Sequence, residues 1–263
     1  MAIAPNPAMP SPTVTRSVPV RVGADLSKRI AANITVVVPV YNTPTAYLDE
    51  CLHSLLRQTV RPREILIVDD GTTRMETAAY LNAARAWAGL RLVRNDRNIG
   101  LGPTMNRALR LCQADFVLKL DSDDVARPRL IERFAAFIAT NRHLDVLGCQ
   151  CQNFGMTDFV TDHPSRVTRD YVMNSFWFVN HTGVLLNRAS LLAVKGYRRM
   201  RGLAEDYELW IRMMLSGYRR FYNLPDVLVD YRDLPTGLHR NFLRINRPMK
   251  MAARTLMRIC PNF

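Results

Sequence analysis

The sequence lacks several features that would place it in a membrane or outside the cell. No stretch approaches the roughly 20 consecutive apolar residues of a membrane-spanning helix. The first 23 residues lack the early basic cluster followed by an apolar block that a secretory signal requires. The five cysteines are odd in number and scattered, which favours free thiols in a reducing compartment over a disulfide framework. We therefore expect a cytoplasmic protein, attached at most to the inner face of a membrane.

Metal-finger and nucleic-acid modules are also missing. Cys149 and Cys151 have no second close cysteine pair with which to complete a zinc site. Their spacing is that of alternate residues on a strand, which explains the pair without a metal. The net charge of +13 would suit a nucleic-acid partner, but no aromatic–basic module accompanies it. Much of the charge lies at the chain ends, above all in residues 240–263. We expect no nucleic-acid partner.

What the chain does contain is an alternation of short apolar runs and longer helical patterns. We expect strands at 34–38, 64–70, 90–95, 116–120 and 144–151. Helices are expected between them, the first with Thr43 as N-cap and Pro44 at its first position, the second opened by a capping box, Thr73 to Glu76. Continuous apolar strands with helical crossovers are typical of a mostly parallel α/β sheet covered by helices on both faces.

The second half of the chain has a different rhythm. Helices are expected near 188–194 and over 205–215, and two further strands at 218–223 and 227–231. No internal repeat is present. We expect a leader without regular structure at 1–33, one domain at 34–239 and a basic amphipathic helix at 240–263. Within the domain, a nucleotide-binding half extends to about residue 122 and an acceptor half follows.

Polar side chains follow three of the expected parallel strands. Asn42 follows the first strand, Asp69 and Asp70 end the second, and Asp121 and Asp123 follow the fourth. Ligands of open parallel sheets bind at the carboxyl ends of the strands. Each acid taken alone could equally be a helix cap. Three such groups on one edge favour a binding crevice.

The run VLKLDSDD brings three carboxylates together directly after an apolar strand. Asp121, Asp123 and Asp124 would repel one another in an empty site, so a cation is expected among them. Hard divalent cations prefer oxygen ligands and can bridge carboxylates to a diphosphate. The run therefore indicates a site for Mn²⁺ or Mg²⁺ that arrives with a nucleotide diphosphate.

The order of the motifs resembles the family-2 glycosyltransferases, enzymes of the GT-A fold, over roughly residues 34–240. The resemblance rests on VVVPVYNTP, ILIVDDGTT, NDRNIGLGPTMNRAL, LKLDSDD, VNHTGVLLNRASLLAVKGYRR and GLAEDYELWIRM. Each motif is loose alone, but the order and spacing are specific. The resemblance implies a Rossmann-like fold and a metal-dependent, inverting transfer of a sugar from a nucleotide diphosphate, with uridine as the expected base.

Residue roles in the donor site follow from the same resemblance. It implies that Pro39, Tyr41 and Asn42 line the nucleotide pocket and that Asp69 and Asp70 bind the base. A further set would serve the ribose and the metal: Asp121 for the ribose or the metal, Asp123 as principal metal ligand, and His239 near the diphosphate or metal. The run around His239 departs from the usual family pattern, so an exposed, structural histidine is an equal alternative.

Roles on the acceptor side follow too. The resemblance implies that Asp206 is the general base, with Glu205 beside it, and that His181 faces the acceptor or the phosphates. Glu205 and Asp206 begin an apolar helix, where a carboxylate gains from the helix dipole, so a plain cap is the alternative for Asp206. A structural role is equally open for His181. The expected partners are a nucleotide-sugar donor and a saccharide or lipid-linked acceptor, as in the synthesis of bacterial surface polysaccharides or glycolipids.

Two other functions compete with this interpretation. A sugar-phosphate nucleotidyltransferase would need a glycine-rich phosphate loop after the first strand, and PVYNTP is not one. A catalytically inactive nucleotide-sugar-binding protein is disfavoured by the presence of both Asp123 and Asp206. Hydrolysis or transfer of the donor by purified protein would separate the three.

The tail has a two-sided pattern when projected as a helix. Its six basic residues fall within one third of the circumference, and apolar residues occupy the opposite side: Arg240, Arg244, Arg247, Lys250, Arg254 and Arg258 against Phe242, Ile245, Met249, Ala252, Leu256 and Ile259. Such a helix either packs on the core with a solvated basic face or lies on an anionic membrane surface.

If the tail is a membrane anchor, replacing the six basic residues with glutamine should release the protein from anionic liposomes. Activity on a soluble acceptor should not change. Wild-type binding should weaken with added salt, because salt screens exposed charges. Sedimentation with liposomes measures both effects, and failure of the wild type to sediment at low salt would leave only the core-packing alternative.

Overall fold

The computed structural model describes residues 24–31, 33–141, 143–175, 177–199 and 205–235. The first half alternates strands and helices, in the order β1 (Ile34–Val40), α2 (Thr45–Leu56), β2 (Glu64–Asp69), α3 (Met75–Ala84), β3 (Leu90–Arg94), α4 (Leu101–Leu111) and β4 (Phe116–Lys119). The second half continues with β5 (Val125–Ala126), α5 (Leu130–Thr140), β6 (Val146–Gly155), β7 (Phe159–Val160), α6 (Arg169–Asn174), β8 (Val184–Asn187), α7 (Arg188–Ala193), α8 (Glu205–Leu215) and β9 (Phe221–Asp233).

The described strands form one mixed sheet with the order β3-β2-β1-β4-β8-β6-β9-β5, and β7 pairs with β6 outside this path. The part of the sheet formed by β3-β2-β1-β4 is parallel throughout. The parallel order ends at β8, which is antiparallel to both β4 and β6. The carboxyl ends of β1, β2 and β4 therefore share one edge of the sheet with the start of β8.

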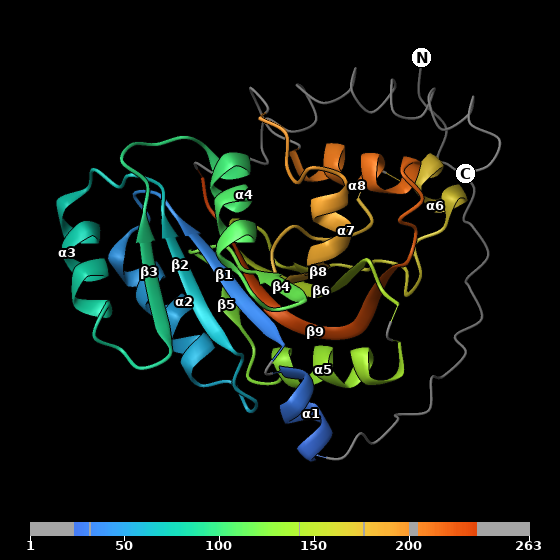
Figure 1. The fold of residues 1–263 in the computed structure, drawn as a ribbon, viewed down its shortest axis with the longest axis horizontal. Coiled ribbons are helices and arrows are strands. Elements are labelled where there is room, and N and C mark those ends of the chain that lie inside the picture. Colours follow the sequence, from blue (N-terminus) through green and yellow to red (C-terminus); the bar gives the residue numbers. More distant parts are fainter. Residues whose placement is uncertain (1–23, 32, 142, 176, 200–204, 236–263) are drawn as a thin grey trace.

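Helices cover both faces of the sheet, as the apolar strands predict (Figure 1). One core contains buried residues of α1 (Ala24–Ala31), α2, α3 and α5, and the other contains those of α4, α6, α7 and α8. Alternate residues of β1 point into the two cores, Val36 and Val38 into the first and Val37 into the second. The predicted α/β class and the helices on both faces are confirmed.

The predicted leader is wrong for its last part. Residues 24–31 form α1, which packs against α5, with Ala31 fully buried in the first core. The apolar side of this short helix, including the partly buried Ile30, has a neighbour to pack on, which stabilises the helix. Residues 1–23 and the predicted tail helix at 240–263 lie outside the described part of the chain.

Both predicted helix caps are also wrong. Pro44 is the N-cap of α2, and the hydroxyl of Thr43 instead bonds to that of Ser122 at 2.6 Å. Helix α3 starts at Met75, and Thr73 does not cap it. Asn42, from the end of β1, accepts the backbone N–H groups at this helix start instead. Tertiary contacts thus replaced local caps at both helices.

The two strands predicted at 218–223 and 227–231 are one strand, β9. Its register with β6 shifts on either side of Gln150, so that Leu224 pairs with Cys149 and Val227 with Gln150. The residues between them bulge out of the ladder, and Pro225 is exposed there because it has no N–H to give to the partner strand. A bulge, rather than a turn, accounts for the proline.

The described cysteines are buried and free, as expected. Cys149 and Cys151 lie on the same face of β6 and pack in the same core as Leu147. No helix within the described ranges is long and apolar enough to cross a bilayer.

Gly71, just after β2, has φ +72° and lies directly against another segment of backbone. A Cβ added there would lie 2.5 Å from the carbonyl carbon of Arg97. Gly89, with φ +87°, has nothing within 4 Å of such a Cβ. The pair separates the effect of the left-handed conformation from that of close approach.

Gly71→Ala should therefore destabilise the protein more than Gly89→Ala does. Gly89→Ala should cost about 1–2 kcal/mol, the price of a left-handed conformation for an L-residue. Gly71→Ala should cost the same and at least about 1 kcal/mol more, because backbone must move. Urea unfolding measures both, and equal losses would contradict the close contact with Arg97.

Candidate active site

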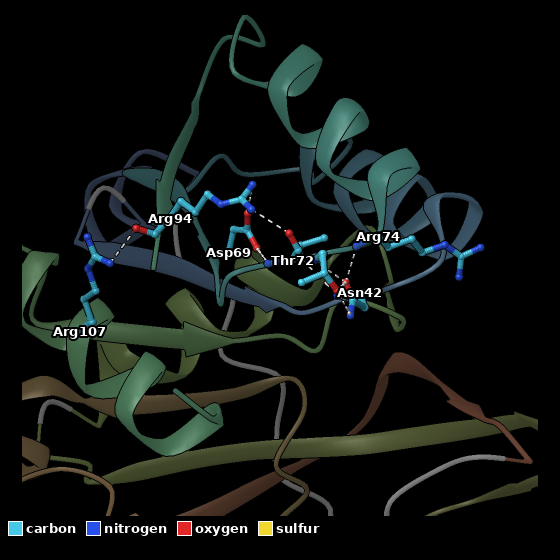
Figure 2. A network of polar contacts seen from close by, with 7 residues as sticks. Asn42, Asp69, Thr72, Arg74, Arg94 and Arg107 are labelled. Carbon is cyan, nitrogen blue, oxygen red and sulfur yellow. Dashed lines mark hydrogen bonds and ion pairs between the residues drawn. The ribbon is translucent and has the colours of Figure 1, made fainter. Parts of the chain in front are cut away.

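The end of β1 is tied to the start of α3 by Asn42. Its Oδ1 accepts the backbone N–H of Thr73 and of Arg74, each at 2.9 Å, and Figure 2 shows it beneath Arg74. Asn42 has a left-handed backbone, with φ 54°. Its neighbours differ in exposure, because Pro39 is buried within β1 while Tyr41 is 47% exposed. Of the three predicted pocket residues, Tyr41 is the one whose side chain faces solvent.

Asp69, the last residue of β2, is buried and has two protein partners. Its Oδ1 accepts the backbone N–H of Thr72 at 2.8 Å, and its Oδ2 lies 3.3 Å from Nη1 of Arg94. Arg94 also donates from Nη2 to the carbonyl of Thr72 (Figure 2). Asp69 and Arg94 therefore bond to each other and both bond to the backbone of Thr72. Asp69 thus shapes the turn that follows β2.

Asp70 holds the loop before α4. Its carboxylate accepts from Nδ2 of Asn95 at 2.7 Å and from the backbone N–H groups of Ile99 and Gly100, each at 2.9 Å. Gly100 is the N-cap of α4, so the carboxylate also compensates the positive end of that helix. Arg107 of α4 in turn donates to the carbonyl of Arg94 at 2.8 Å (Figure 2).

The turn after β4, residues 121–124, is named the acid turn here, and Lys119 is a cation beside it. The side chain of Lys119 is 1% exposed, and its Nζ lies 2.6 Å from Oδ1 and 2.7 Å from Oδ2 of Asp121. Residues two apart on a strand point to the same face, so Lys119 and Asp121 meet on the side of the second core. A positive charge expected near these carboxylates is therefore partly supplied by the chain itself.

Asp123 and Asp124 lie on the other side of the turn. Asp124 is fully buried, its Oδ1 accepts the backbone N–H of Arg232 at 2.8 Å, and its Oδ2 has no hydrogen-bond partner among the described residues. Burial and the charge of Asp121 raise the pKa of Asp123 to about 6. Burial, and then Asp121 and Asp123, raise the pKa of Asp124 well above its usual range. Negative charge on this side of the turn is thus only partly compensated.

The carboxylates of the acid turn suit a divalent ion, but the part of the chain that the structure describes does not by itself supply enough ligands to hold one. Across the ranges the structure describes, no three His, Cys, Asp or Glu side chains come together to hold a metal. Mg²⁺ commonly binds through one or two carboxylates and substrate phosphates, which needs fewer protein ligands. Asp123, with its raised pKa, and the unpartnered Oδ2 of Asp124 are what an incoming cation would neutralise.

Asp206 lies in the first turn of α8 and shares the electrostatic field of the acid turn. Burial raises the pKa of Asp206. The positive charge of Lys119 lowers this pKa, and the negative charge of Asp121 raises it further. Glu205 precedes it and also has a partner in the structure. Contacts also link α8 to the acid turn, because Trp210 of α8 packs against His181, and the neighbouring Thr182 accepts the backbone N–H of Asp121 at 3.2 Å.

His181 has structural partners between these groups. Its Nε2 lies 3.0 Å from the hydroxyl of Tyr197, and its ring packs edge-on against Trp210, with centroids 6.1 Å apart. Burial, then the charge of Lys119, lowers the pKa of His181 well below its usual range, so the ring is neutral at pH 7. Burial, and then the charges of Asp206 and Glu205, raise the pKa of Tyr197 well above its usual range.

The structure thus brings together most of the predicted site residues. Asn42, Asp69, Asp70 and the acid turn occupy one edge, and the charge of Lys119 beside that turn acts on both Asp206, in α8, and His181, just before β8. His239 lies outside the described residues. Two residues that the sequence analysis did not select, Lys119 and Arg232, contact the acid turn directly. Residues two apart on a strand share a face, so the sequence could have placed Lys119 beside Asp121. No local pattern pairs Arg232 with Asp124, 108 residues earlier in the chain.

Comparison with known proteins agrees with this geometry. The family model described as Glycosyl transferase family 2 matches residues 35–194, more than half of the chain. The UDP-Gal:alpha-D-GlcNAc-diphosphoundecaprenol beta-1,3-galactosyltransferase of Escherichia coli is 30% identical over 191 residues, which are 71% of this chain and 68% of that protein. The amylovoran biosynthesis glycosyltransferase AmsE of Erwinia amylovora is 28% identical over 210 residues, 75% of each chain.

Solved structures share the fold. S. aureus TarS 1–349 in complex with UDP-GlcNAc superposes with a TM-score of 0.66 at 24% identity, over 79% of this chain and 60% of that one. The mannosyltransferase PcManGT of Pyrobaculum calidifontis, in complex with GDP-Man and Mn²⁺, gives 0.62 at 20% identity, over 86% and 64%. This chain spans less than two thirds of either, and the likeness concerns the fold. By its family match, its curated relatives and this fold, the chain belongs to glycosyl transferase family 2 and is a glycosyltransferase of the GT-A type.

Proposed function

We propose that this enzyme transfers a sugar, with inversion, from a uridine diphosphate donor to a hydroxyl group of a saccharide or lipid-linked acceptor, and that it needs Mn²⁺ or Mg²⁺. The observation that carries the proposal is the position of Asp206, on α8, within the electrostatic field of Lys119 and Asp121. A carboxylate on the acceptor side of the sheet thus faces carboxylates at the donor edge.

The donor nucleotide would lie along the ends of β1 and β2. Tyr41 is exposed there, and Pro39 and Asn42 shape the floor. A carboxylate offers about four lone-pair positions. Asp69 uses two of these and Asp70 three for protein donors, so each has capacity left for a base N–H. Asp121, held by Lys119, is assigned to the ribose.

The metal would be held by Asp123, with Asp121 and His239 as further candidates, together with the donor diphosphate. When bound, it would neutralise negative charge that develops on the departing diphosphate. The chain's own task is to present Asp123 in one orientation, and the buried Asp124 and the hydroxyl contact between Thr43 and Ser122 serve that task.

Asp206 is assigned the role of general base. Its carboxylate would take the proton of the acceptor hydroxyl as that oxygen bonds to the anomeric carbon, and the bond from that carbon to the diphosphate breaks with its electrons leaving on the diphosphate. Burial raises the pKa of Asp206 toward the range where a base is effective, and Lys119 keeps the ionised form accessible. Glu205 and His181 are assigned to the acceptor side.

A lipid-linked acceptor is supported by the name of the relative from Escherichia coli, which acts on a GlcNAc-diphosphoundecaprenol. The relative from Erwinia amylovora is named for polysaccharide synthesis. The net charge of +13 suits an acceptor that is presented at an anionic membrane surface on the cytoplasmic side.

Asp206→Asn should lower turnover by roughly 10²–10⁴-fold with near-normal donor affinity, because the amide cannot accept the proton. In the wild type, activity should rise with pH through the raised pKa of Asp206, since the ionised form is the base. The Asp206→Asn variant should lose this rise of activity with pH. Steady-state kinetics as a function of pH measure all three quantities.

Glu208→Gln is the matched control, because it also removes a carboxylate from the first turn of α8 and Glu208 has no assigned role in the reaction. A loss of helix stabilisation would affect both variants alike. Turnover of Asp206→Asn above about a tenth of the wild type would leave Asp206 as a cap and not a base.

Asp123→Ala should abolish metal-dependent binding of UDP and leave the fold intact, because it removes a ligand and also relieves repulsion in the acid turn. Calorimetry with and without Mn²⁺ measures the binding. Asp158→Ala removes an equal charge from an exposed position of the β6–β7 connection and should bind UDP normally. Equal metal-dependent affinity in Asp123→Ala and wild type would contradict the assignment.

A further inference from the structure

Arg232, near the end of β9, holds the acid turn at two points. Its backbone N–H donates to Oδ1 of Asp124 at 2.8 Å, and its Nε donates to the backbone carbonyl of Asp123 at 2.9 Å. One residue thus fixes a side chain and the main chain of the turn together. The turn has one further bond of its own, from the N–H of Asp124 to the carbonyl of Asp121 at 3.2 Å.

The guanidinium group of Arg232 is itself held in place. It lies 4.2 Å from the ring centre of Tyr47 on α2 and 4.7 Å from that of Phe154 on β6. Its Nη2 donates to Glu50, one turn further along α2. The side chain is only 11% exposed. Segments from α2, the acid turn, β6 and β9 therefore meet at one planar cation.

We propose that Arg232 is a positioning residue, which fixes the acid turn in the form that binds the donor diphosphate and its metal ion. The inference rests on the proposed function and adds a residue outside the motif itself. Three carboxylates within four residues repel one another, and the turn that presents Asp123 needs a cation that stays when metal and donor leave. Arg232 meets this need from the side opposite Lys119.

The geometry requires arginine and not a positive charge alone. The Nε–H reaches the carbonyl of Asp123 while the plane of the group packs between two aromatic rings. Lysine is a point charge on a flexible stem and has neither the directed Nε–H nor the plane. Arg232→Lys therefore separates positioning from simple charge compensation.

Arg127 provides the matched control. It directly follows β5, which pairs with β9. Its guanidinium donates to Oδ1 of Asp230 on β9 at 3.0 and 2.8 Å. Arg127→Gln removes an arginine–carboxylate pair from β9 without removing the donors to Asp123 and Asp124. It therefore measures the general effect of losing an arginine in this region.

The first experiment measures UDP binding by calorimetry in the presence of Mn²⁺. Arg232→Gln and Arg232→Lys should each lose about tenfold or more in affinity, the usual range for a residue that orients a ligand of a metal. Arg127→Gln should bind as the wild type does. Restored affinity in Arg232→Lys, or an equal loss in Arg127→Gln, would overturn the positioning role.

The second experiment needs neither metal nor nucleotide. Deuterium uptake of peptides that cover residues 118–127 should rise in both Arg232 variants, because the bond from the Asp124 N–H opens with the turn. Uptake in β1 should stay unchanged, and Arg127→Gln should behave as the wild type. Unchanged uptake in the turn, or a uniform rise over the chain, would overturn the inference. If the wild type binds no nucleotide diphosphate with any divalent ion, the proposed function fails, and the uptake result alone decides the role of Arg232.

Discussion

Charge compensation around the acid turn is the constraint on which the rest of the site depends. Three carboxylates follow β4 within four residues, and one of them, Asp124, is fully buried. Isolated charges in such a place are costly unless they are paired or protonated. Lys119 contacts the acid turn on one side and Arg232 contacts it on the other. What remains uncompensated, at Asp123 and at Oδ2 of Asp124, is the part that suits a divalent ion.

Lys119 and Arg232 lie on opposite faces of the sheet and act on different groups. Lys119 points into the side of the sheet that α8 covers, where it lowers the pKa of both His181 and Asp206. Arg232 lies on the side of α2 and β9. The acid turn and Asp206 are thus electrostatically coupled through Lys119, although different helices support them. Such coupling makes the ionisation of Asp206 sensitive to the state of the donor edge.

The residues proposed to bind the donor nucleotide also order the ends of β1 and β2. Asn42, Asp69 and Asp70 each accept backbone N–H groups from the loop that follows or from a neighbouring loop. Figure 2 shows how Arg94 closes one of these loops around Thr72. Loops that are held by side chain-to-backbone bonds of this kind are ordered without a ligand, so less conformational entropy would be lost if they bind one.

The sequence by itself determined the class of the fold, the family, and the strand ends at which the site lies. Those features follow from local patterns, since apolar runs, helical periods and the order of motifs are all read along the chain. Helix capping was wrong at α2 because the hydroxyl of Thr43 bonds to that of Ser122, and at α3 because the distant Asn42 accepts the backbone N–H groups before the helix. Two strands were predicted where β9 is continuous, because only the pairing with β6 shows that the residues between them form a bulge. Tertiary structure alone decided that Arg232 contacts the acid turn, because the sheet brings its backbone N–H to Asp124 and its Nε–H to the carbonyl of Asp123 across more than 100 residues of chain.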